Sequence, residues 1–486
     1  MSTDSHAPVV TERRRLFTDA HRAHWDRVAR DAPNGFAGGR GYQRELQRVI
    51  RNVVLPGQRV LELGCGAGDL LAALAPSAGV GVDFSPEMTA RAAARHPALR
   101  FVTADVLDAE VDGTFDVIVL SDLLNEIWDA QSLFKRMARW CTPDTRIVIS
   151  LHSQLWKPAL DVVRALGLAA PMLEQNWFTP TDVTMLLALE GFETVRRNRE
   201  ILCPAPIPLV QPLANRWLAK LPLFGAFSLV NVFVARRVTP RSEAPAVPPR
   251  VSVVVPARNE AGNIPALVER IPEMGAGTEI VFVEGGSTDD TWAAIHREVA
   301  ARPDREFRVL QQTGRGKGDA VRAGFREATG NLFMILDADI SVAPEDLRLF
   351  YDAIMSGRGE MINGVRLVYP MDGKAMQFAN LVANKAFGLI FTWLLGQPVK
   401  ETLCGTKVLW RRHYEQIAAR RAHFGELDPF GDFDLLFGAA RLSLRIVDVP
   451  VRYQERVYGS TNIQRWRHGV LLLRMVLLAA RRLRFV

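Results

Sequence analysis

The chain's 486 residues are too many for one ordinary hydrophobic core, so two domains are expected, and fractions of 48% hydrophobic and 23% charged residues indicate a globular protein. Four widely separated cysteines without a CxxC pair exclude a disulfide framework and a zinc site, and they favour a reducing cytosol. The net charge of +7 favours an anionic partner, but basic and aromatic residues are not interleaved in one block, so nucleic acid is not the partner we expect.

The hydropathy of the sequence indicates whether the chain is secreted or spans a membrane. The first residues, MSTDSHAPVVTERRR, lack the apolar run of a secretory signal peptide. No stretch reaches the roughly 20 apolar residues that a membrane-spanning helix needs. We therefore predict a cytoplasmic protein.

Short apolar runs that alternate with helical segments predict two successive α/β domains. Residues 1–40 are charged and weakly periodic, as in an arm followed by a helix. Within residues 41–238, runs such as RVLELG, GVGVDFS and FDVIVLSD indicate the buried strands of a doubly wound parallel sheet. Residues 239–250 are rich in proline and predict a linker. The alternation starts again at VSVVVPARNE, so residues 251–486 are predicted to form the second doubly wound domain.

A glycine-rich turn follows the first strand of the first domain. In LELGCGAGDL, Gly64, Gly66 and Gly68 lie between an apolar strand and an apolar helix. Glycines at such a turn let the backbone approach a ligand and direct amide N–H groups at it. A dinucleotide fingerprint would carry glycine or alanine where Asp69 stands, so the pattern favours another adenosine-containing cofactor.

Three acidic residues narrow the choice of cofactor to S-adenosylmethionine (SAM). Glu62 precedes the turn, where a carboxylate favours the cationic methionine end of SAM over a pyrophosphate. Asp83 ends the next strand, about twenty residues on, where it can accept hydrogen bonds from both ribose hydroxyls. Asp105 follows the third strand and is positioned to meet the adenine amino group.

With the glycines, this series resembles class I methyltransferases over roughly residues 40–238, which implies a Rossmann-like, SAM-binding domain. The alternative is a plain Rossmann-like fold with structural glycines. Because the sulfonium of SAM is already activated, catalysis is mostly alignment, with a base where the acceptor carries a proton. Four residues that follow the later strands are candidates for contact with the methyl acceptor, or else helix caps and solvated groups: Asp122, Asn125, Glu126 and His152.

Polar residues also end the first strand of the second domain. In VSVVVPARNE these are Pro256, Arg258, Asn259 and Glu260. A strand end that exposes such groups resembles the nucleotide-binding start of family 2 glycosyltransferases, which have the GT-A fold.

Two further segments match that family in the expected order. In VFVEGGSTDDT, Glu284 stands where the family usually has aspartate, and it keeps a carboxylate for the base or the ribose. In GRGKGDAVRAGF, Arg315 and Lys317 lie on a glycine-rich loop. Cations on a loop that can fold around an anion fit the phosphates of a nucleotide sugar.

The segment MILDADI carries two aspartates directly after an apolar strand. Alternation along extended chain puts Asp337 and Asp339 on the same side, where two carboxylates repel each other unless a divalent cation lies between them and the diphosphate. We predict that Asp339 is the main metal ligand and that Asp337 meets the nucleotide. The metal is a hard, oxygen-binding ion, Mg²⁺ or Mn²⁺.

Across nearly all of residues 250–486, the second domain resembles the polyprenyl-phosphate sugar transferases of the dolichol-phosphate mannosyl- or glucosyltransferase type. The resemblance implies that Arg456 binds phosphate and that an acidic residue lies near the acceptor, at Asp434 or alternatively at Asp432. A lipid phosphate is already anionic, so a cationic cradle that includes Lys385, Lys407 and Arg456 would then matter more than a base. Each of these lysines has the alternative of a solvated surface charge.

The C-terminal segment WRHGVLLLRMVLLAARRLRFV is apolar but short. Arg467, Arg474 and Arg481 recur every seven residues, so on a helix they share one face amid leucines. Such a helix fits an anionic membrane surface, and residues 383–396 could form a second interfacial helix. The alternative is that both segments pack against the core of the second domain.

These observations predict a bifunctional transferase on the cytosolic face of a membrane. Its second domain transfers a sugar from a nucleotide sugar to a polyprenyl phosphate or related lipid, and its first domain methylates an unknown acceptor. The alternative is a glycosyltransferase whose SAM-binding domain is a non-catalytic regulatory or scaffold module.

Overall fold

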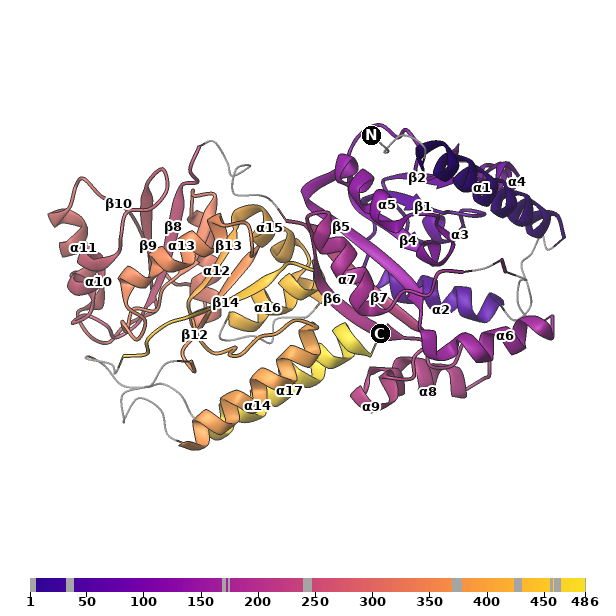
Figure 1. Cartoon of the computed structure of the whole chain (residues 1–486). Helices are drawn as coiled ribbons and strands as arrows, with labels where there is room; N and C mark the ends of the chain where they lie inside the picture. Colours follow the sequence, from indigo (N-terminus) through magenta and orange to yellow (C-terminus); the bar gives the residue numbers. More distant parts are fainter. Residues whose placement is uncertain are drawn as a thin grey trace. The chain divides into compact units, whose positions relative to one another are not determined.

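The computed structural model contains two compact units (Figure 1). The first comprises Met1–Val238 and Phe485–Val486, and the second comprises Thr239–Arg484. Each unit is described by itself, because their positions relative to one another are not determined. The predicted linker lies outside the described residues except for its last four positions. The described residues are 6–31, 39–167, 172–173, 175–238, 247–368, 378–423, 431–454, 458 and 465–485.

The first unit contains a seven-stranded sheet in the order β3-β2-β1-β4-β5-β7-β6. Neighbouring strands among β1 to β5 are parallel, whereas β7 is antiparallel to both β5 and β6. The predicted α/β fold is confirmed, and the last two strands make the sheet mixed rather than fully parallel. The strands are β1 (Arg59–Leu63), β2 (Ala78–Asp83), β3 (Arg100–Thr103), β4 (Phe115–Ser121), β5 (Cys141–His152), β6 (Phe192–Glu200) and β7 (Val230–Arg237).

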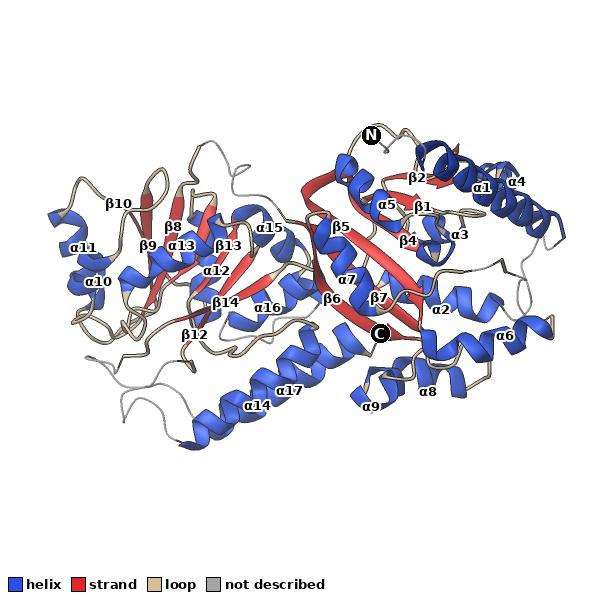
Figure 2. Cartoon of the chain, in the orientation of Figure 1, coloured by secondary structure: helices blue, strands red, loops and turns tan. Residues whose placement is uncertain are grey.

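Helices cover both faces of this sheet, which explains why its central strands are almost entirely apolar (Figure 2). Alternate residues of β4 point to opposite faces: Ile118 and Leu120 pack with α5 and α7, whereas Val117 and Val119 pack with α2 and α3. The helices are α1 (His6–Asp31), α2 (Gly39–Arg51), α3 (Asp69–Ala73), α4 (Pro86–Arg95), η1 (Leu123–Glu126), α5 (Ala130–Met137), η2 (Ala138–Trp140), η3 (Gln154–Trp156), α6 (Lys157–Ala165), α7 (Pro180–Leu189), α8 (Val210–Arg216), η4 (Leu218–Lys220) and α9 (Pro222–Gly225).

The second unit has its own seven-stranded sheet, in the order β10-β9-β8-β11-β13-β12-β14. β13 is antiparallel to both of its neighbours, and the other pairs are parallel. This confirms the second predicted α/β domain, again with a mixed sheet. The strands are β8 (Val251–Ala257), β9 (Thr278–Glu284), β10 (Glu306–Gln311), β11 (Leu332–Ile335), β12 (Met361–Val365), β13 (Lys407–Trp410) and β14 (Ile446–Pro450).

Close packing of a helix on this sheet positions a glycine-rich loop. A Cβ atom on Gly324 of α12 would touch the side chains of Val254 on β8 and Val283 on β9, so glycine lets the helix lie directly on the sheet. The helices are α10 (Ile264–Arg270), α11 (Thr291–Ala301), α12 (Lys317–Glu327), η6 (Pro344–Asp346), α13 (Leu347–Met355), α14 (Phe378–Leu395), α15 (Arg411–Ala419), η7 (Arg421–His423), α16 (Asp432–Arg441), α17 (Arg465–Ala479) and the π-helical turn η8 (Ala480–Arg484).

The two segments predicted to be interfacial helices, α14 and α17, lie side by side (Figure 1). Phe391 of α14 packs on Phe433 and Phe437 of α16, with ring centroids 5.3 and 5.6 Å apart. Met475 and Ala479 of α17 are also buried, so both helices take part in core packing, as one alternative predicted. Over the ranges that the structure describes, every helix is too short or too polar to span a bilayer.

Candidate active sites

The glycine-rich turn joins β1 to α3 at the carboxyl edge of the first sheet. Gly64, Gly66 and Gly68 have φ angles of 73°, 49° and 75°, a region that side chains rarely adopt. A Cβ atom on Gly68 would lie 2.7 Å from the ring of Phe101, whereas one on Gly66 would meet nothing within 4 Å. The turn therefore needs glycine for its backbone, and at Gly66 it borders open space where a ligand can approach.

Glu62, on β1 just before this turn, has a buried carboxylate whose hydrogen bonds are incomplete. Only 2% of the residue is exposed, and its Oε2 atom has no hydrogen-bond partner among the described residues. Burial raises the pKa of Glu62 well above its ordinary value. An orphaned buried carboxylate oxygen is costly, so this atom fits a ligand that brings a cationic group, as the methionine end of SAM does.

Asp83 ends β2 directly beside the turn. Its Oδ2 accepts a hydrogen bond from the Gly66 N–H at 2.9 Å, and its Oδ1 accepts one from the Ser85 N–H at 3.0 Å. Burial raises the pKa of Asp83, and the two amides oppose that effect. A carboxylate has about four acceptor positions, so two remain for ribose hydroxyls.

The long helix α1 crosses this edge of the sheet, which the sequence did not predict. Arg14 and Thr18 each donate to Asp105 Oδ2 at 3.3 Å, and the Trp25 indole N–H donates to Glu126 Oε2 at 2.6 Å. Asp105 is thus engaged by α1, and an adenine amino group would share this carboxylate with Arg14. The contacts join residues far apart in the sequence, and α1 carries no motif that would have revealed them.

In the second unit, the segments with Asn259 and Glu284 come together at the carboxyl ends of β8 and β9. The Ser287 hydroxyl accepts from the Asn259 N–H at 3.0 Å, and Asn259 Oδ1 accepts from the Thr288 N–H at 2.8 Å. Glu284, 4% exposed, accepts from the Ser287 N–H at 2.5 Å. Asn259 has a φ of 58°, which asparagine tolerates better than most residues. The other predicted nucleotide-sugar residues of this strand end are half-buried or exposed: Pro256, Arg258 and Glu260.

Lys317 begins α12 and contacts the first of the two aspartates. Its Nζ lies 2.5 Å from Asp337 Oδ1, and a Cβ atom on Gly405 would collide with both groups. Burial alone would raise the pKa of Asp337, but the ammonium of Lys317, with Arg366 and Lys407, holds that pKa below its ordinary value. The three carboxylates Asp337, Asp432 and Asp339 raise the pKa of Lys317, against its burial. Lys317 is therefore a fixed cation and Asp337 a fixed anion.

Asp339 lies two residues further on and is 7% exposed. Its Oδ1 accepts from the Ser341 N–H at 3.0 Å, and the intervening Ile340 has a φ of 53°. A β-branched residue at positive φ is strained, and such strain clusters at functional sites. With Asp337 the residue offers only carboxylate oxygens, the donor type that Mg²⁺ and Mn²⁺ prefer, so the pair fits the predicted metal.

Comparison with known proteins matches each of the two units to a protein family model. Residues 36–197 match the model of a methyltransferase domain, and residues 252–425 match that of glycosyl transferase family 2. The chain joins a methyltransferase domain to a family 2 glycosyltransferase domain.

The glycosyltransferase domain resembles the polyprenyl-phosphate sugar transferases. It is 29% identical over 220 residues to a polyprenol monophosphomannose synthase of Mycolicibacterium smegmatis, a match that covers 44% of this chain and 81% of the relative. Five further relatives, at 24–29% identity, are named as undecaprenyl-phosphate 4-deoxy-4-formamido-L-arabinose transferases or a dolichol-phosphate mannosyltransferase. The chain covers 59–62% of their length, which is less than two thirds.

Solved structures match each domain only distantly. The magnesium protoporphyrin IX methyltransferase of Synechocystis, with bound SAH, is 19% identical over 47% of this chain and 99% of that chain, with a TM-score of 0.32. A glucosyl-3-phosphoglycerate synthase of Mycobacterium tuberculosis, in complex with Mn²⁺, UDP and its product, is 20% identical over 48% of this chain and 80% of that chain, with a TM-score of 0.36.

The acceptor candidates of the methyltransferase domain converge on Asp122. Its side chain accepts hydrogen bonds from Tyr42 at 2.6 Å and Ser150 at 2.8 Å, and makes no cap bond to the η1 helix that follows. His152 Nε2 lies 4.0 Å from Asp122 Oδ2, and its Nδ1 is 3.5 Å from Asn125. Burial and the Asp122 carboxylate raise the pKa of Tyr42, so Tyr42 stays a proton donor. These side chains therefore form one polar cluster around Asp122, and Asp122 does not cap the helix that follows it.

Glu126, the fourth acceptor candidate, is separate from this group. It accepts from Trp25 at 2.6 Å and from Gln175 at 3.4 Å. Burial raises the pKa of Glu126 to about 7, and the hydrogen bond from Trp25 opposes this. The pKa of Glu126 thus lies near neutral pH, above that of an exposed glutamate.

Of the two acidic residues predicted near the acceptor, Asp432 rather than Asp434 connects to the Asp337 group. Lys407 is fully buried, with its Nζ 3.1 Å from Asp432 Oδ1 and 2.6 Å from the Cys404 carbonyl oxygen. Asp434 instead pairs with Arg421 at 2.6 Å. Of the other cradle candidates, Lys385 is exposed on α14, whereas Lys407 is buried.

Arg456 lies outside the described residues, but its neighbour Tyr458 is described. The Tyr458 hydroxyl is 3.3 Å from Asp289 Oδ2, and a Cβ atom on Gly262 would lie 2.7 Å from the Tyr458 ring. Tyr458 thus contacts the loops that carry Asn259 and Glu284, although it is about 200 residues away along the chain.

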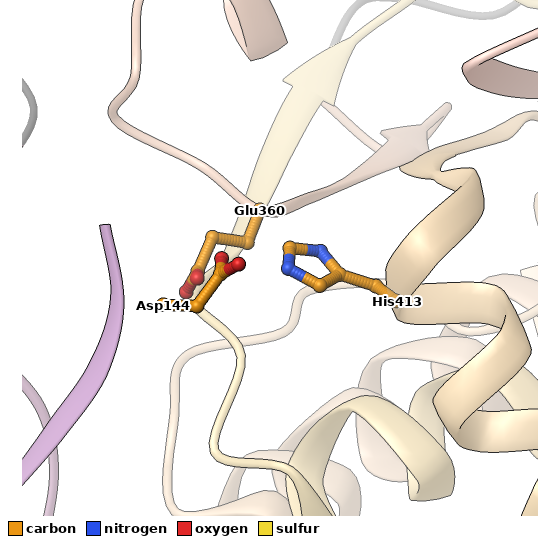
Figure 3. A group of neighbouring side chains, drawn as sticks. All are labelled: Asp144, Glu360 and His413. Carbon is orange, nitrogen blue, oxygen red and sulfur yellow. The ribbon is translucent and has the colours of Figure 1, made fainter. Parts of the chain in front are cut away.

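Figure 3 shows Glu360 and His413 of the glycosyltransferase domain together with Asp144 of the methyltransferase domain. The Arg445 N–H donates to Glu360 Oε2 at 2.9 Å, so this carboxylate has a partner within its own domain. Asp144 belongs to β5 of the methyltransferase domain.

Proposed function

We propose that the chain is a bifunctional transferase that moves a sugar from a nucleotide sugar to a polyprenyl phosphate and a methyl group from SAM to a second acceptor. The observation that carries the glycosyl transfer is the convergence of four distant segments at one sheet edge. The loops with Asn259 and Glu284 offer polar groups to the nucleoside, and Lys317 lies beside Asp337 and Asp339 where a diphosphate would bind.

Asp339 and Asp337 would hold the divalent metal, which, when bound, neutralises charge on the departing nucleoside diphosphate. Lys317 would contact the diphosphate and orient it. A polyprenyl phosphate acceptor is already anionic, so no strong general base is needed, and Asp432 and Lys407 would shape the acceptor side. Arg456 is proposed to bind the acceptor phosphate. The names of the relatives support this class of acceptor.

The methyltransferase domain would bind SAM through four groups in separate roles. Glu62 would bind the methionine ammonium, Asp83 the ribose hydroxyls and Asp105 the adenine amino group. The backbone of the Gly64–Gly68 turn would lie against the bound SAM. The orphaned Oε2 of Glu62 supports binding of a cationic ligand. A domain that binds SAM without turnover remains the second candidate, and detection of labelled methyl groups in lipid extracts would distinguish the two.

The membrane surface is proposed as the place of action. The helices α14 and α17 with the turn η8 expose Leu389, Leu473 and Leu477, and they also expose Arg474 and Arg481. Leucines flanked by arginines fit the interface of an anionic bilayer. The enzyme would then meet its lipid phosphate at headgroup level on the cytosolic face.

The proposal is tested by incubating the protein with Mn²⁺ or Mg²⁺, a panel of radiolabelled nucleotide sugars and polyprenyl phosphates of short and long chain. Label in the lipid phase with one donor supports the proposal. Hydrolysis of donors without transfer to any polyprenyl phosphate would refute the lipid acceptor and leave the donor site intact.

A further inference from the structure

An insertion between β6 and β7 of the methyltransferase domain exposes several large apolar side chains. The segment runs over residues 201–229 and includes α8, η4 and α9. Leu209 is 84% exposed and Leu223 is 73% exposed. We call the exposed side chains of this segment the insertion surface; its main members are Ile207, Leu209, Leu213, Trp217, Leu223 and Phe227.

The insertion surface differs from the scattered apolar residues of an ordinary protein surface. The sequence has no acidic residue between Glu200 and Glu243, while Arg216 is exposed among the apolar residues. Trp217 and Phe227 add aromatic rings, and one face of the Trp217 ring stacks on Phe485. A segment that exposes apolar and aromatic side chains with a basic residue, and that contains no acidic residue of its own, is typical of surfaces that enter a lipid headgroup region.

The backbone of the insertion surface is strained at Leu209. Leu209 has a φ of 63°, a genuine outlier for a bulky residue. Such conformations persist only where the surrounding structure enforces them, and they cluster at functional sites. The most exposed leucine of the segment therefore lies at a backbone position of the kind found at functional sites.

The insertion surface is anchored at the edge where the acceptor candidates lie. Val230, which follows the insertion, pairs with both Glu200 on β6 and His152 on β5. A Cβ atom on Gly41 would lie 2.9 Å from the Pro204 carbonyl oxygen, so the start of the insertion packs next to Tyr42. His152 and the Asp122–Tyr42 pair therefore adjoin the base of the insertion.

We propose that the insertion surface docks on the lipid bilayer, and that the methyl acceptor is a membrane-borne amphiphile whose headgroup reaches the Asp122–His152 group. This inference rests on the proposed methyl transfer from SAM. The transfer would form a bond between a headgroup oxygen or nitrogen and the methyl carbon. The carbon–sulfur bond of SAM would break with its electron pair kept by sulfur, and the acceptor proton would pass to His152.

The test compares two double variants of the full-length protein. Leu209→Glu/Leu223→Glu places two charges on the insertion surface, and Met185→Glu/Leu189→Glu places them on α7 of the same domain, where both residues are exposed. Binding to pure phosphatidylcholine vesicles is measured by sedimentation in high salt, which screens electrostatic attachment. We expect the first variant to lower partitioning by at least about tenfold, because two leucines lose their apolar burial, and the second to stay within about twofold.

A second measurement locates the contact. Vesicles of brominated phosphatidylcholine should quench the tryptophan fluorescence of the wild type, and Trp217→Phe should remove most of that quenching. Equal loss of binding in both double variants, or unchanged quenching in Trp217→Phe, would overturn the proposal. So would a lipid-free dimer, seen by light scattering, that Leu209→Glu/Leu223→Glu dissociates, because the surface would then be an interface between two copies. Calorimetry of SAM binding tests the proposed function separately. If the wild-type protein does not bind SAM, the proposed methyl transfer is refuted, whereas docking of the insertion surface on the bilayer is not.

Discussion

Lys317 Nζ lies 2.5 Å from Asp337 Oδ1, so the first residue of α12 is joined to the loop that follows β11. The sequence placed the two residues in different motifs, one for phosphate and one for metal. In the structure they form one charge pair, whose side chains are 26% and 29% exposed. A bound metal–diphosphate would therefore meet a cation and an anion that already hold each other in position.

Removal of this cation should weaken donor binding. In Lys317→Ala, Asp337 loses its ion pair and the diphosphate loses a charge-assisted contact, so we expect the KM for the nucleotide sugar to rise at least about tenfold. Arg326→Ala, at an exposed position of the same helix, is the matched control. Steady-state kinetics at saturating metal provides the measurement. A KM that rises equally in both variants would show a general loss of positive charge instead.

The predicted metal role of Asp339 is tested by its removal. Asp339→Ala should lower sugar transfer and donor hydrolysis by at least about a hundredfold, because a main oxygen ligand is lost. SAM affinity should be unchanged, since the other domain binds it. Asp352→Ala, an exposed aspartate of the same domain, should keep its activity. Full wild-type activity in excess chelator would contradict the metal role.

Local sequence patterns were sufficient to predict two α/β sheets and the loops that carry Gly64–Gly68 and Asp337, but not the antiparallel strands β7 and β13. They encode strand–turn–helix geometry within a few residues, and geometry of this kind is set by glycine and by apolar periodicity. They did not reveal the contacts of Arg14 with Asp105, because α1 lies 91 positions from it along the chain and its helical residues carry no motif. The same holds for Lys317 and Asp337, whose pairing depends on how α12 packs against the sheet.

The insertion surface escaped prediction for a different reason. Apolar residues over 201–229 look like the core of a strand–helix pattern, since sequence alone does not distinguish buried from exposed leucine. Only the structure shows that Leu209 and Leu223 face outward. Both Asp432 and Asp434 fitted the sequence prediction of an acidic residue near the acceptor, and the contact of Asp432 with Lys407, a buried residue 25 positions earlier, could not be foreseen.

Asp83 should control SAM affinity. Asp83→Ala removes a carboxylate that accepts from Gly66 and Ser85 and is proposed to bind the ribose, so SAM binding should weaken by roughly 1–3 kcal/mol. Asp112→Ala, at an exposed position of the same domain, should bind normally. Isothermal calorimetry measures both, with melting curves to confirm folding. An unchanged Kd in Asp83→Ala would remove the ribose assignment.

Glu126 should make the stability of the methyltransferase domain depend on pH. Burial raises its folded-state pKa to about 7, above the ordinary 4.5, so the folded state binds the proton more tightly than the unfolded state. Its stabilising contribution is present at pH 4.5 and below, and is lost as pH rises towards 7. Glu126→Gln mimics the protonated form and avoids this loss.

The melting temperature of Glu126→Gln minus that of the wild type should therefore increase between pH 5 and 7 and level off above. The transition to follow is the one that SAM shifts upward. Glu87→Gln, at an exposed glutamate near α1, should show no such trend. A difference that stays constant over this range would mean that Glu126 is ionised in the folded protein throughout.

The arginines of α17 and η8 should govern attachment to anionic membranes. Truncation would be a poor test, because Met475 and Ala479 are buried and their loss would disturb α14. Reversal of three exposed charges, Arg474→Glu, Arg481→Glu and Arg482→Glu, leaves that packing intact. Each basic residue near an anionic surface contributes on the order of 1 kcal/mol, so binding to phosphatidylglycerol vesicles should fall by about a hundredfold or more at low salt.

The control for this experiment is a variant with the same net charge as the α17 variant. Arg297→Glu, Arg326→Glu and Arg358→Glu reverse three exposed charges on α11, α12 and the loop after α13 of the same domain. If α17 faces the membrane, this variant keeps most of its vesicle binding, and its transfer to long-chain polyprenyl phosphate exceeds that of the α17 variant. Transfer to a short, soluble acceptor should be equal in the two, since neither touches the donor site. Equal vesicle binding by both variants would mean that the net charge of the protein, and not α17, attracts it to anionic lipid.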